Sequence, residues 1–266
     1  MICAGIDAGS RTIKVVLLDR RTLNMVGSGV VDQGIEQAAL ADRLLDDVLS
    51  EAGLSRNDVA AIVATGYGRK LIHGADAQMT EITCQAAGVW HCLPGTRTII
   101  DIGGQDSKFL QLLPSGKVGD FAMNDRCAAG TGRFLETAAT QLGLRVAELG
   151  QLARQSKLVA QISSMCVVFA ETEIVGLLAQ GCTAEDIAAG IQASIAQRIN
   201  TMGGLTAKPP VVFTGGVALV PAMDGALGNA LGHPVTIAPD PQVTCALGAA
   251  IMAAKRLNSS KGTGDV

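Results

Sequence analysis

The chain has 266 residues, of which 48% are apolar and only 3% aromatic, and its formal net charge is -3. This length exceeds one average domain, and 32 glycines beside an aliphatic core favour an α/β protein with two lobes. Because Lys and Arg are few and scattered, the sequence predicts no nucleic-acid partner and no attachment to anionic lipid.

Export and membrane signals are absent from the sequence as given. Residues 1–6 run straight into Asp7 and a glycine-rich loop, and no apolar stretch approaches the roughly 18 residues of a membrane helix. We therefore expect a cytoplasmic protein without a membrane partner. Seven cysteines are an odd number, and a reducing cytosol disfavours disulfides, which leaves metal binding, redox chemistry or burial for them.

The first 95 residues predict a hairpin followed by alternating helices and strands. Alternating apolar residues indicate strands at 1–6, 13–19 and 24–31, and the first two flank a tight turn. Helical spacing is found at 35–51 and 81–92, on either side of a buried strand at 59–64. Pro94-Gly95 then predicts a turn that ends this series of helices and strands.

Beyond this turn the opening pattern returns, as a strand at 98–101, a glycine loop and a strand at 107–113. A shift of 94 positions places Asp101 on Asp7, Gly103 on Gly9, Lys108 on Lys14 and Leu112 on Leu18, which is a weak internal repeat. Further helices are predicted at 132–142, 146–154, 170–180, 184–201 and 244–256, and strands at 211–213 and 235–238. The tail 258–266 is expected to fray.

Both repeats place an Asp at the end of a strand, followed by small residues. Backbone amides in such a loop cradle phosphates, while the carboxylate holds Mg²⁺ through water. A strand followed by Thr214-Gly215-Gly216 would let a purine lie on bare backbone. Two equivalent lobes that face each other would place both loops on the walls of one nucleotide cleft.

At these residues the chain resembles the ATPase superfamily of actin, sugar kinases and heat-shock chaperones. The segments 7–12, 101–106 and 213–217 resemble its first phosphate, second phosphate and adenosine motifs. The superfamily often has a hydroxyl residue where Arg11 stands. By this resemblance Asp7 and Asp101 serve Mg²⁺, and Gln105 orients the attacking water. Phosphate contacts come from the two loops, at Gly9, Ser10, Arg11, Thr12, Lys14, Gly103 and Gly104. Adenosine contacts come from Thr214, Gly215, Gly216 and Gln242.

Cys127 and Cys166 each begin a predicted helix. The unpaired amides of a helix N-terminus and the helix dipole favour the thiolate, which is the form that binds metal. No C-x-x-C spacing occurs, which argues against zinc and against a ferredoxin-type cluster within one chain. A [4Fe-4S] cluster takes four thiolates, and a homodimer would supply two from each subunit.

The segments 64–69, 124–134 and 163–173 closely resemble the activator proteins of 2-hydroxyacyl-CoA dehydratases and the related ATPase subunits of benzoyl-CoA reductase. The match covers nearly the whole chain. It implies that Cys127 and Cys166 of two subunits hold one [4Fe-4S] cluster on the dimer axis. It also implies two actin-like (ribonuclease H-like) α/β lobes, formed by residues 1–94 with 243–266 and by residues 95–242.

The resulting hypothesis is an ATPase coupled to electron transfer. Ferredoxin or flavodoxin would reduce it, and ATP hydrolysis to ADP would drive one electron to an iron-sulfur acyl-CoA dehydratase or reductase. The alternatives are a sugar or acid kinase with incidental cysteines, and a nucleotide-switched filament protein without iron. Glu171 and Glu173 could line the nucleotide cleft or could have a surface or capping role. The remaining cysteines are expected to be core or surface residues and not ligands: Cys3, Cys84, Cys92, Cys182 and Cys245.

Overall fold

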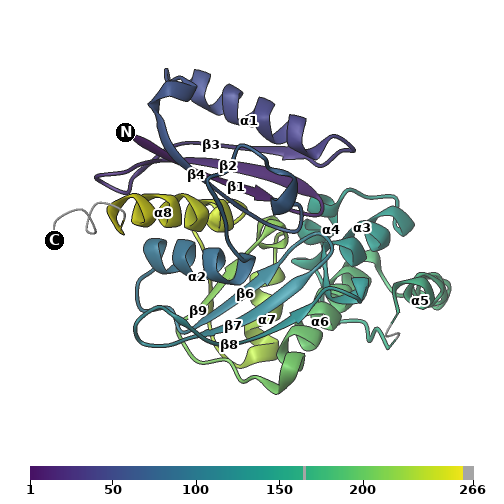
Figure 1. The fold of residues 1–266 in the computed structure, drawn as a ribbon. Coiled ribbons are helices and arrows are strands. Elements are labelled where there is room, and N and C mark those ends of the chain that lie inside the picture. Colours follow the sequence, from purple (N-terminus) through teal and green to yellow (C-terminus); the bar gives the residue numbers. More distant parts are fainter. Residues whose placement is uncertain (164–165, 260–266) are drawn as a thin grey trace. The chain divides into compact units, whose positions relative to one another are not determined.

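The computed structural model describes residues 1–163 and 166–259 (Figure 1). It separates into two compact units. Unit 1 consists of Met1–Gly95, Ser115–Val118 and Val243–Val266, and unit 2 consists of Thr96–Pro114 and Gly119–Gln242. Each unit contains a five-stranded sheet with helices packed against it. In the part of the chain that is described, no helix is both long and apolar enough to span a membrane.

The sheet of unit 1 has the order β3-β2-β1-β4-β5. Its central strand β1 is antiparallel to β2 and parallel to β4, and all seven of its residues are buried. Burial on both faces explains the nearly continuous apolar run at the start of the chain. The strands are β1 (Ile2–Ala8), β2 (Thr12–Asp19), β3 (Met25–Asp32), β4 (Val59–Thr65) and β5 (Ala77–Gln78).

Helices cover both faces of this sheet. Figure 1 shows α1 (Gln37–Glu51) on one face and α8 (Thr244–Ser259) on the other, with α2 (Glu81–Cys92) beyond α8. The apolar stripe of α1 is buried against β2 and β3. Helices α2 and α8 lie so close together that a Cβ on Gly248 would be 1.7 Å from the Cys84 carbonyl oxygen. Gln85 of α2 donates to the Thr244 hydroxyl over 2.9 Å in the same contact.

Unit 2 repeats this plan with the sheet order β10-β9-β6-β7-β8. Its core joins Phe109 and Phe213 of the sheet to a row of isoleucines on α6. The strands are β6 (Thr98–Ile102), β7 (Ser107–Leu112), β8 (Val118–Asn124), β9 (Val211–Thr214) and β10 (Val235–Ile237). The helices are α3 (Gly132–Gln141), α4 (Val146–Ala153), α5 (Val167–Ala179), α6 (Ala184–Asn200) and α7 (Met223–Leu231).

The predicted internal repeat corresponds to a repeat of structure. The two sheets have the same strand order once β6 to β10 are matched with β1 to β5. Asp7 pairs across the hairpin with Lys14, and Asp101 pairs with Lys108 at the equivalent register. The prediction of two α/β lobes built on one plan is therefore confirmed at the level of the fold.

Some elements differ from the sequence-based expectation. Strands β5 and β8 and helix α7 were not predicted, and α5 begins at Val167 rather than at residue 170. Cys127 does not begin a long helix: it precedes a three-residue 3₁₀ turn, Ala128–Gly130, and α3 starts at Gly132 with Thr131 as its cap. Ser164 and Met165 of the predicted cysteine segment, and residues 260–266 of the predicted frayed tail, lie outside the described residues.

The loop that follows α4 is fastened by one carboxylate. Asp186, in the first turn of α6, accepts hydrogen bonds from the Ser156 hydroxyl and from the N–H groups of Lys157 and Leu158, at 2.8 to 3.0 Å. The Leu158 N–H and then the Ser156 hydroxyl hold the pKa of Asp186 below its ordinary value. Because the folded pKa is depressed, the stabilisation is present above the ordinary carboxyl pKa and is lost as the pH falls through the folded value.

We therefore expect Asp186→Asn to lower the melting temperature at pH 7 and to matter progressively less below roughly pH 4, where the carboxyl of the unfolded chain becomes protonated. Melting curves of both proteins between pH 3 and pH 8 would measure this. A difference in melting temperature that stays constant over that range would contradict the assignment.

Candidate nucleotide and cluster site

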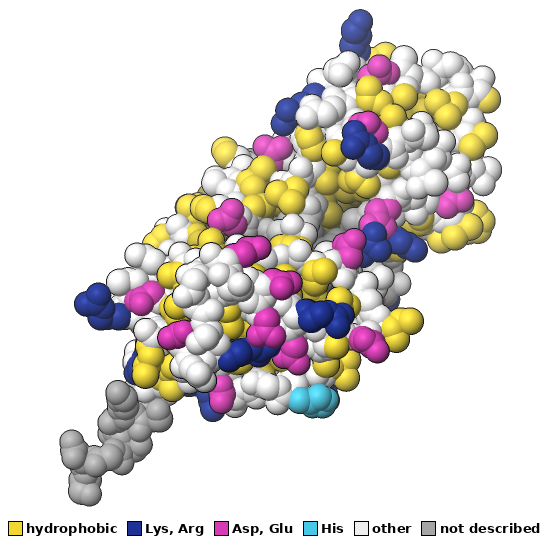
Figure 2. Space-filling model, turned by 90° about the horizontal axis from the view of Figure 1, so that it is seen from above, with side chains coloured by type: hydrophobic (Ala, Val, Ile, Leu, Met, Phe, Trp, Pro, Cys, Tyr) yellow, Lys and Arg dark blue, Asp and Glu magenta, His cyan; other side chains and the backbone are white. Residues whose placement is uncertain are grey.

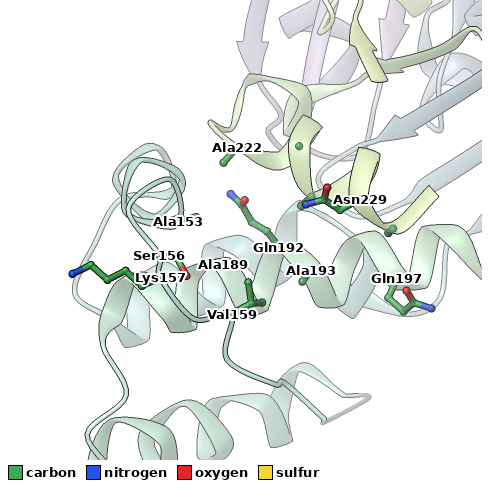
Figure 3. Close-up of a pocket in the computed structure, with 13 residues that line it drawn as sticks. Ala153, Ser156, Lys157, Val159, Ala189, Gln192, Ala193, Gln197, Ala222 and Asn229 are labelled. Atoms are coloured by element: carbon green, nitrogen blue, oxygen red, sulfur yellow. The ribbon is translucent and has the colours of Figure 1, made fainter. Parts of the chain in front are cut away.

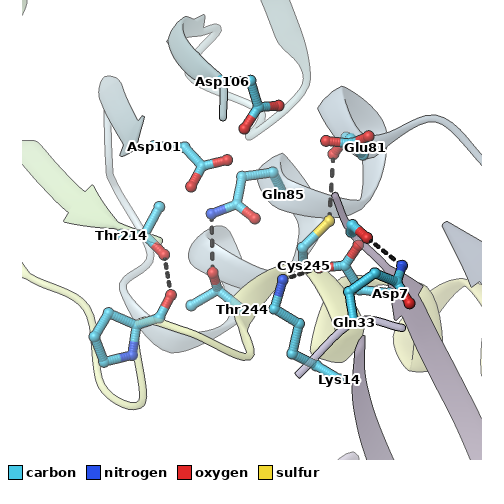
Figure 4. Close-up of polar contacts among 12 residues, drawn as sticks. Asp7, Lys14, Gln33, Glu81, Gln85, Asp101, Asp106, Thr214, Thr244 and Cys245 are labelled. Atoms are coloured by element: carbon cyan, nitrogen blue, oxygen red, sulfur yellow. Dashed lines mark hydrogen bonds and ion pairs between the residues drawn. The ribbon is translucent and has the colours of Figure 1, made fainter. Parts of the chain in front are cut away.

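The first phosphate loop connects β1 to β2 in unit 1. Lys14 Nζ lies 3.0 Å from Asp7 Oδ2 (Figure 4). The Gly9 N–H donates to the Thr12 carbonyl over 3.1 Å and closes the turn. Gln33, just after β3, donates from Nε2 to the Gly9 carbonyl over 2.6 Å. The carboxylate and the turn are thus both fixed before any ligand arrives.

The second phosphate loop connects β6 to β7 in unit 2 and has the same design. Lys108 Nζ lies 3.4 Å from Asp101 Oδ2 and also contacts the Asp106 carboxylate. The Gly103 N–H donates to the Asp106 carbonyl over 2.9 Å. Gln105 is exposed at the tip, where a ligand can reach it. The other predicted phosphate contacts lie on these two loops or their flanking strands: Ser10, Arg11, Thr12, Lys14, Gly103 and Gly104.

A glycine with a left-handed φ borders each loop. Gly66, after β4, has φ +91°, and a Cβ there would lie 2.5 Å from Asp7 Oδ1. Gly215, after β9, has φ +90°, and a Cβ there would lie 2.5 Å from Asp101 Oδ1. Only glycine combines this backbone conformation with so close an approach to a carboxylate. The repeat therefore includes the following strand and its Thr-Gly end as well as the hairpin.

The predicted adenosine residues come together in unit 2. The Thr214 hydroxyl and the Gly215 N–H both donate to the Pro241 carbonyl, over 2.6 and 2.9 Å (Figure 4). This ties the end of β9 to the segment that carries Gln242. Gln242 Nε2 lies 4.0 Å from the position that a Cβ on Gly216 would occupy. Thr214 is fully buried, so its side chain anchors the loop and leaves the glycine backbone for a ligand.

Sequence analysis missed two residues of this arrangement. Gly66 could have been found, because Thr65-Gly66 after a buried strand repeats Thr214-Gly215 in the second half. Gln33 has no comparable signal, since its role depends on the pairing of β3 with β2, which brings it to the first phosphate loop.

The two aspartates suit Mg²⁺ held through water. Among the described residues, no three His, Cys, Asp or Glu side chains gather as a metal site. The Asp7 and Asp101 side chains are only 8% and 13% exposed, and each has a lysine at one oxygen. Mg²⁺ keeps several waters and takes one or two protein carboxylates together with phosphate oxygens. The carboxylates fit that role, and the lysines offset part of the cost of burying them.

Gly215 allows a direct test of this geometry. A methyl group there would meet Asp101 Oδ1 and the Ile102 carbonyl oxygen on a strained backbone. We expect Gly215→Ala to destabilise the protein by about 2–4 kcal/mol. Gly225→Ala is the matched control, because a Cβ on this α7 glycine meets nothing within 4 Å. Thermal melting of both variants measures the effect, and equal melting temperatures would contradict the prediction.

The seven cysteines fall into two groups. Cys127 and Cys166 are exposed, whereas the others are buried or half-buried. Burial raises the pKa of the Cys84 thiol to about 12 and raises the pKa of Cys3 as well. A thiol kept protonated in this way is a poor metal ligand. The accessible pair is thus the pair that the sequence motifs single out.

Cys166 is the residue immediately before α5, so it begins a helix as its motif predicts, although that helix starts at Val167 and not at residue 170. Its thirteen-residue helix offers free N–H groups at that end. The preceding segment is held by Glu173 of the same helix, whose Oε1 accepts from the Ser163 N–H over 2.8 Å and from the Ser163 hydroxyl over 2.6 Å. Glu173 thus fastens the segment that precedes the helix. Cys127 has only the short 3₁₀ turn behind it.

The donor set fits a shared iron-sulfur cluster. Soft thiolates are the ligands of [4Fe-4S] clusters, and each cluster needs four. One chain presents two exposed thiols, and no cluster of three potential ligands exists in residues 1–163 and 166–259. The residues therefore suit the group only if a second chain contributes the other pair.

A hollow of about 510 Å³ lies elsewhere in unit 2, between the end of α4, α6 and α7 (Figure 3). Six of its thirteen lining residues are alanines, and Gln192, Asn229 and Lys157 are among the polar residues that line it. Gln192 is committed to the Pro221 carbonyl at 2.8 Å. None of the motif residues lines this hollow, so it has no evident part in nucleotide or cluster chemistry.

Figure 2 shows one face of the molecule, on which Lys and Arg side chains are interspersed with Asp and Glu. The electrostatic field of that face is mixed in sign. Nothing on it favours a polyanion such as a nucleic acid.

Comparison with known proteins assigns the chain to a family. Residues 4–253 match the BadF/BadG/BcrA/BcrD ATPase family. The chain belongs to this ATPase family. The activator of lactoyl-CoA dehydratase from Anaerotignum propionicum is 42% identical to it over 256 residues, which are 95% of this chain and 97% of that protein.

Solved structures agree with this assignment. The activator of 2-hydroxyisocaproyl-CoA dehydratase from Clostridium difficile, with bound ADPNP, superposes with a TM-score of 0.92 at 38% identity, over 100% of this chain and 99% of that one. Component A of the Acidaminococcus fermentans (R)-2-hydroxyglutaryl-CoA dehydratase gives 0.92 and 38%, over 97% and 99%. This ATPase therefore has the actin-like fold, and the resemblance noted from the sequence is confirmed.

Proposed function

We propose that this ATPase is the activator of an iron-sulfur 2-hydroxyacyl-CoA dehydratase, to which it delivers one electron at the expense of ATP. Two thiols, Cys127 and Cys166, are exposed on a chain whose other cysteines are wholly or partly buried, and this single observation carries the proposal. Two relatives support it, because they are named activators of lactoyl-CoA and 2-hydroxyisocaproyl-CoA dehydratases and are 42% and 38% identical to this chain over nearly their whole length. Their names favour a dehydratase partner over a benzoyl-type reductase.

We propose that Asp7 and Asp101 hold Mg²⁺ through water and that Gln105 orients the attacking water. The Asp-x-Gly loop of each unit would bind phosphate, and Gly215, Gly216 and Gln242 of unit 2 would receive adenosine. The lobes would be residues 1–94 with 243–266, and residues 95–242. The reaction hydrolyses ATP to ADP and phosphate, and the fixed carboxylates and amides need little reorganisation as charge develops.

We propose that the working protein is a homodimer. Each subunit would contribute Cys127 and Cys166 to one [4Fe-4S] cluster, which supplies one-electron redox chemistry when bound. The electron source would be ferredoxin or flavodoxin, and the exposed thiols require a reducing compartment, so a cytoplasmic location follows. The kinase alternative is less favoured, because it gives the two exposed cysteines no role.

Anaerobic purification with iron and sulfide analysis tests this function. One shared cluster per dimer corresponds to about two irons and two sulfides per chain, with a broad absorption band near 400 nm. The reduced protein should then pass electrons to an acceptor faster when Mg²⁺ and ATP are present. Iron-free protein after anaerobic reconstitution would overturn the proposal and would restore the kinase alternative.

A further inference from the structure

The Asn124 side chain holds Cys127 from two sides. Its Oδ1 accepts the Cys127 N–H over 3.0 Å, and its Nδ2 donates to the Cys127 carbonyl over 2.8 Å. Asn124 is the last residue of β8, so its backbone is fixed by the sheet. The exposed cysteine is therefore anchored through one amide on a rigid element.

The chain that follows Cys127 is attached to the second phosphate loop. The Gly132 N–H donates to the Gly103 carbonyl, and the Arg133 N–H donates to the Gly104 carbonyl, both over 2.9 Å. The contact is tight, because a Cβ on Gly132 would lie 3.1 Å from the Gly103 oxygen. The first turn of α3 and this loop thus move together or lose two hydrogen bonds.

The Asn124 side chain also lies close to the C-terminal end of the same loop. Its Nδ2 lies 3.5 Å from the hydroxyl of Ser107, a fully buried residue that directly follows the loop in β7. A Cβ on Gly130 would lie 3.2 Å from that same Nδ2. The Cys127 segment is therefore connected to the second phosphate loop on both sides of the cysteine, through Asn124 before it in the chain and through Gly132 and Arg133 after it.

A peptide group is planar, so its N–H and C=O turn as one body. The peptide whose carbonyl accepts from Gly132 also carries the Gly104 N–H, and the peptide that accepts from Arg133 carries the Gln105 N–H. A phosphate oxygen that binds these N–H groups would reorient the carbonyls on which α3 rests. The nucleotide and the cysteine segment then share the same two peptides.

We propose that Asn124 is a positioning residue, and that it makes the reactivity of the Cys127 thiol depend on the nucleotide bound at the second phosphate loop. This rests on the proposed function, because it assumes that the loop binds phosphate. The hydrogen bond that the structure describes for Cys166 lies within its own helix, where its carbonyl accepts the Ala170 N–H over 2.9 Å, while Glu173 holds Ser163 ahead of it. The two cysteines are therefore expected to respond unequally.

Alkylation of the full-length chain, purified in air without iron and kept with a reductant, measures this. Peptide mass spectrometry gives the rate at each cysteine, with and without a saturating non-hydrolysable ATP analogue and Mg²⁺. We expect the nucleotide to change the rate at Cys127 by about fivefold or more and to change the rate at Cys166 by less. Because the two sites are coupled, alkylation of Cys127 should also change the affinity for the analogue; reciprocity fixes the size of such changes only between binding free energies, so the two factors need not be equal.

Two sets of variants isolate the connection. Asn124→Ala removes all three contacts. Asn124→Asp keeps the bond to the Cys127 N–H and leaves the Ser107 hydroxyl able to donate to the new oxygen, but it loses the bond to the Cys127 carbonyl, which can only accept. Asn229→Ala on α7 is the control. Gly132→Ala places a Cβ against the Gly103 oxygen but keeps the N–H. Gly132→Pro adds the same Cβ, removes the N–H and puts its Cδ where the donated hydrogen lies, so it must push the first turn of α3 away from the loop. Proline suits this first helical position, and Thr131 before it is already extended, at φ -136° and ψ 173°.

We expect Asn124→Ala, Asn124→Asp and Gly132→Pro to reduce the nucleotide response at Cys127 to less than about twofold, whereas Asn229→Ala and Gly132→Ala keep most of it. Melting curves and the analogue's affinity, measured for each variant, separate lost coupling from lost folding or lost binding. A wild-type response that is absent, or that survives in Asn124→Asp and Gly132→Pro, overturns the inference and leaves the proposed function intact. A wild-type chain that binds no nucleotide overturns both.

Discussion

Cys166→Ser and Cys127→Ser should each reduce the iron content of anaerobically prepared protein from about two atoms per chain to nearly none, with loss of the band near 400 nm. Both thiols are exposed, so neither substitution should change the melting temperature of the iron-free protein by more than about 2 °C. The expected loss is nearly complete because a substitution at one cysteine position occurs in both subunits of the dimer and so removes two of the four thiolates. Serine oxygen is a much harder ligand and does not replace them.

Cys182→Ala is the matched control for this pair. Cys182 is a half-buried cysteine of the same unit that lies outside both motifs, and it should keep its full iron content. Iron that persists in Cys127→Ser, or that disappears in Cys182→Ala, would contradict the ligand assignment. The anaerobic preparation matters, because a cluster held by exposed thiolates is expected to be lost in air.

Asp101→Asn should lower kcat for ATP hydrolysis by about 10²–10³-fold. The substitution keeps the shape of the side chain but removes the charge that would hold Mg²⁺. It leaves the Lys108 ammonium, on a side chain that is only 4% exposed, in contact with the Asp106 carboxylate. We expect kcat to fall much more than KM rises, because the ion neutralises charge that develops during hydrolysis. Steady-state phosphate release at several Mg²⁺ concentrations measures both constants.

Asp120→Asn controls for the change of charge. Asp120 is an exposed residue of β8 whose carboxylate accepts only the neighbouring Phe121 N–H among the bonds described. It should hydrolyse ATP at the wild-type rate. An Asp101→Asn variant with unchanged kcat would remove Asp101 from the proposed site and would leave Asp7 as the remaining candidate for Mg²⁺.

The elements that could be predicted from the sequence are those in which local pattern and tertiary environment agree. Helix α2 occupies the predicted residues, because Thr80 caps it and its apolar spacing continues to Cys92. The two Asp-x-Gly hairpins were found because their strands are buried and their turns contain glycine. The shift of 94 residues was visible because Asp and Lys recur at positions that face one another across each hairpin, with Gly in the turn between them.

Other elements carry no such local signal. Strand β8 lies at the edge of its sheet with Phe121 and Met123 exposed, so neither alternation nor burial marks it. Helix α7 is short, contains two glycines and begins after Ala222 in a left-handed conformation, which no capping rule predicts. Cys127 reads as the start of a helix because the residues after it are small, but Thr131 is the better cap, and α3 begins there.

The sequence by itself determined the two-lobed α/β plan, the phosphate and adenosine motifs and the pair of cysteines, because each depends on residue types at fixed short spacings. Only the tertiary structure decided which carboxylate oxygen each lysine meets, why Gly66 and Gly215 must be glycine, and how Asn124, Gly132 and Arg133 connect Cys127 to the second phosphate loop. These are contacts between strands and loops that are distant in the chain or face each other across a sheet. Their geometry is fixed by packing and register, which no spacing along the sequence records.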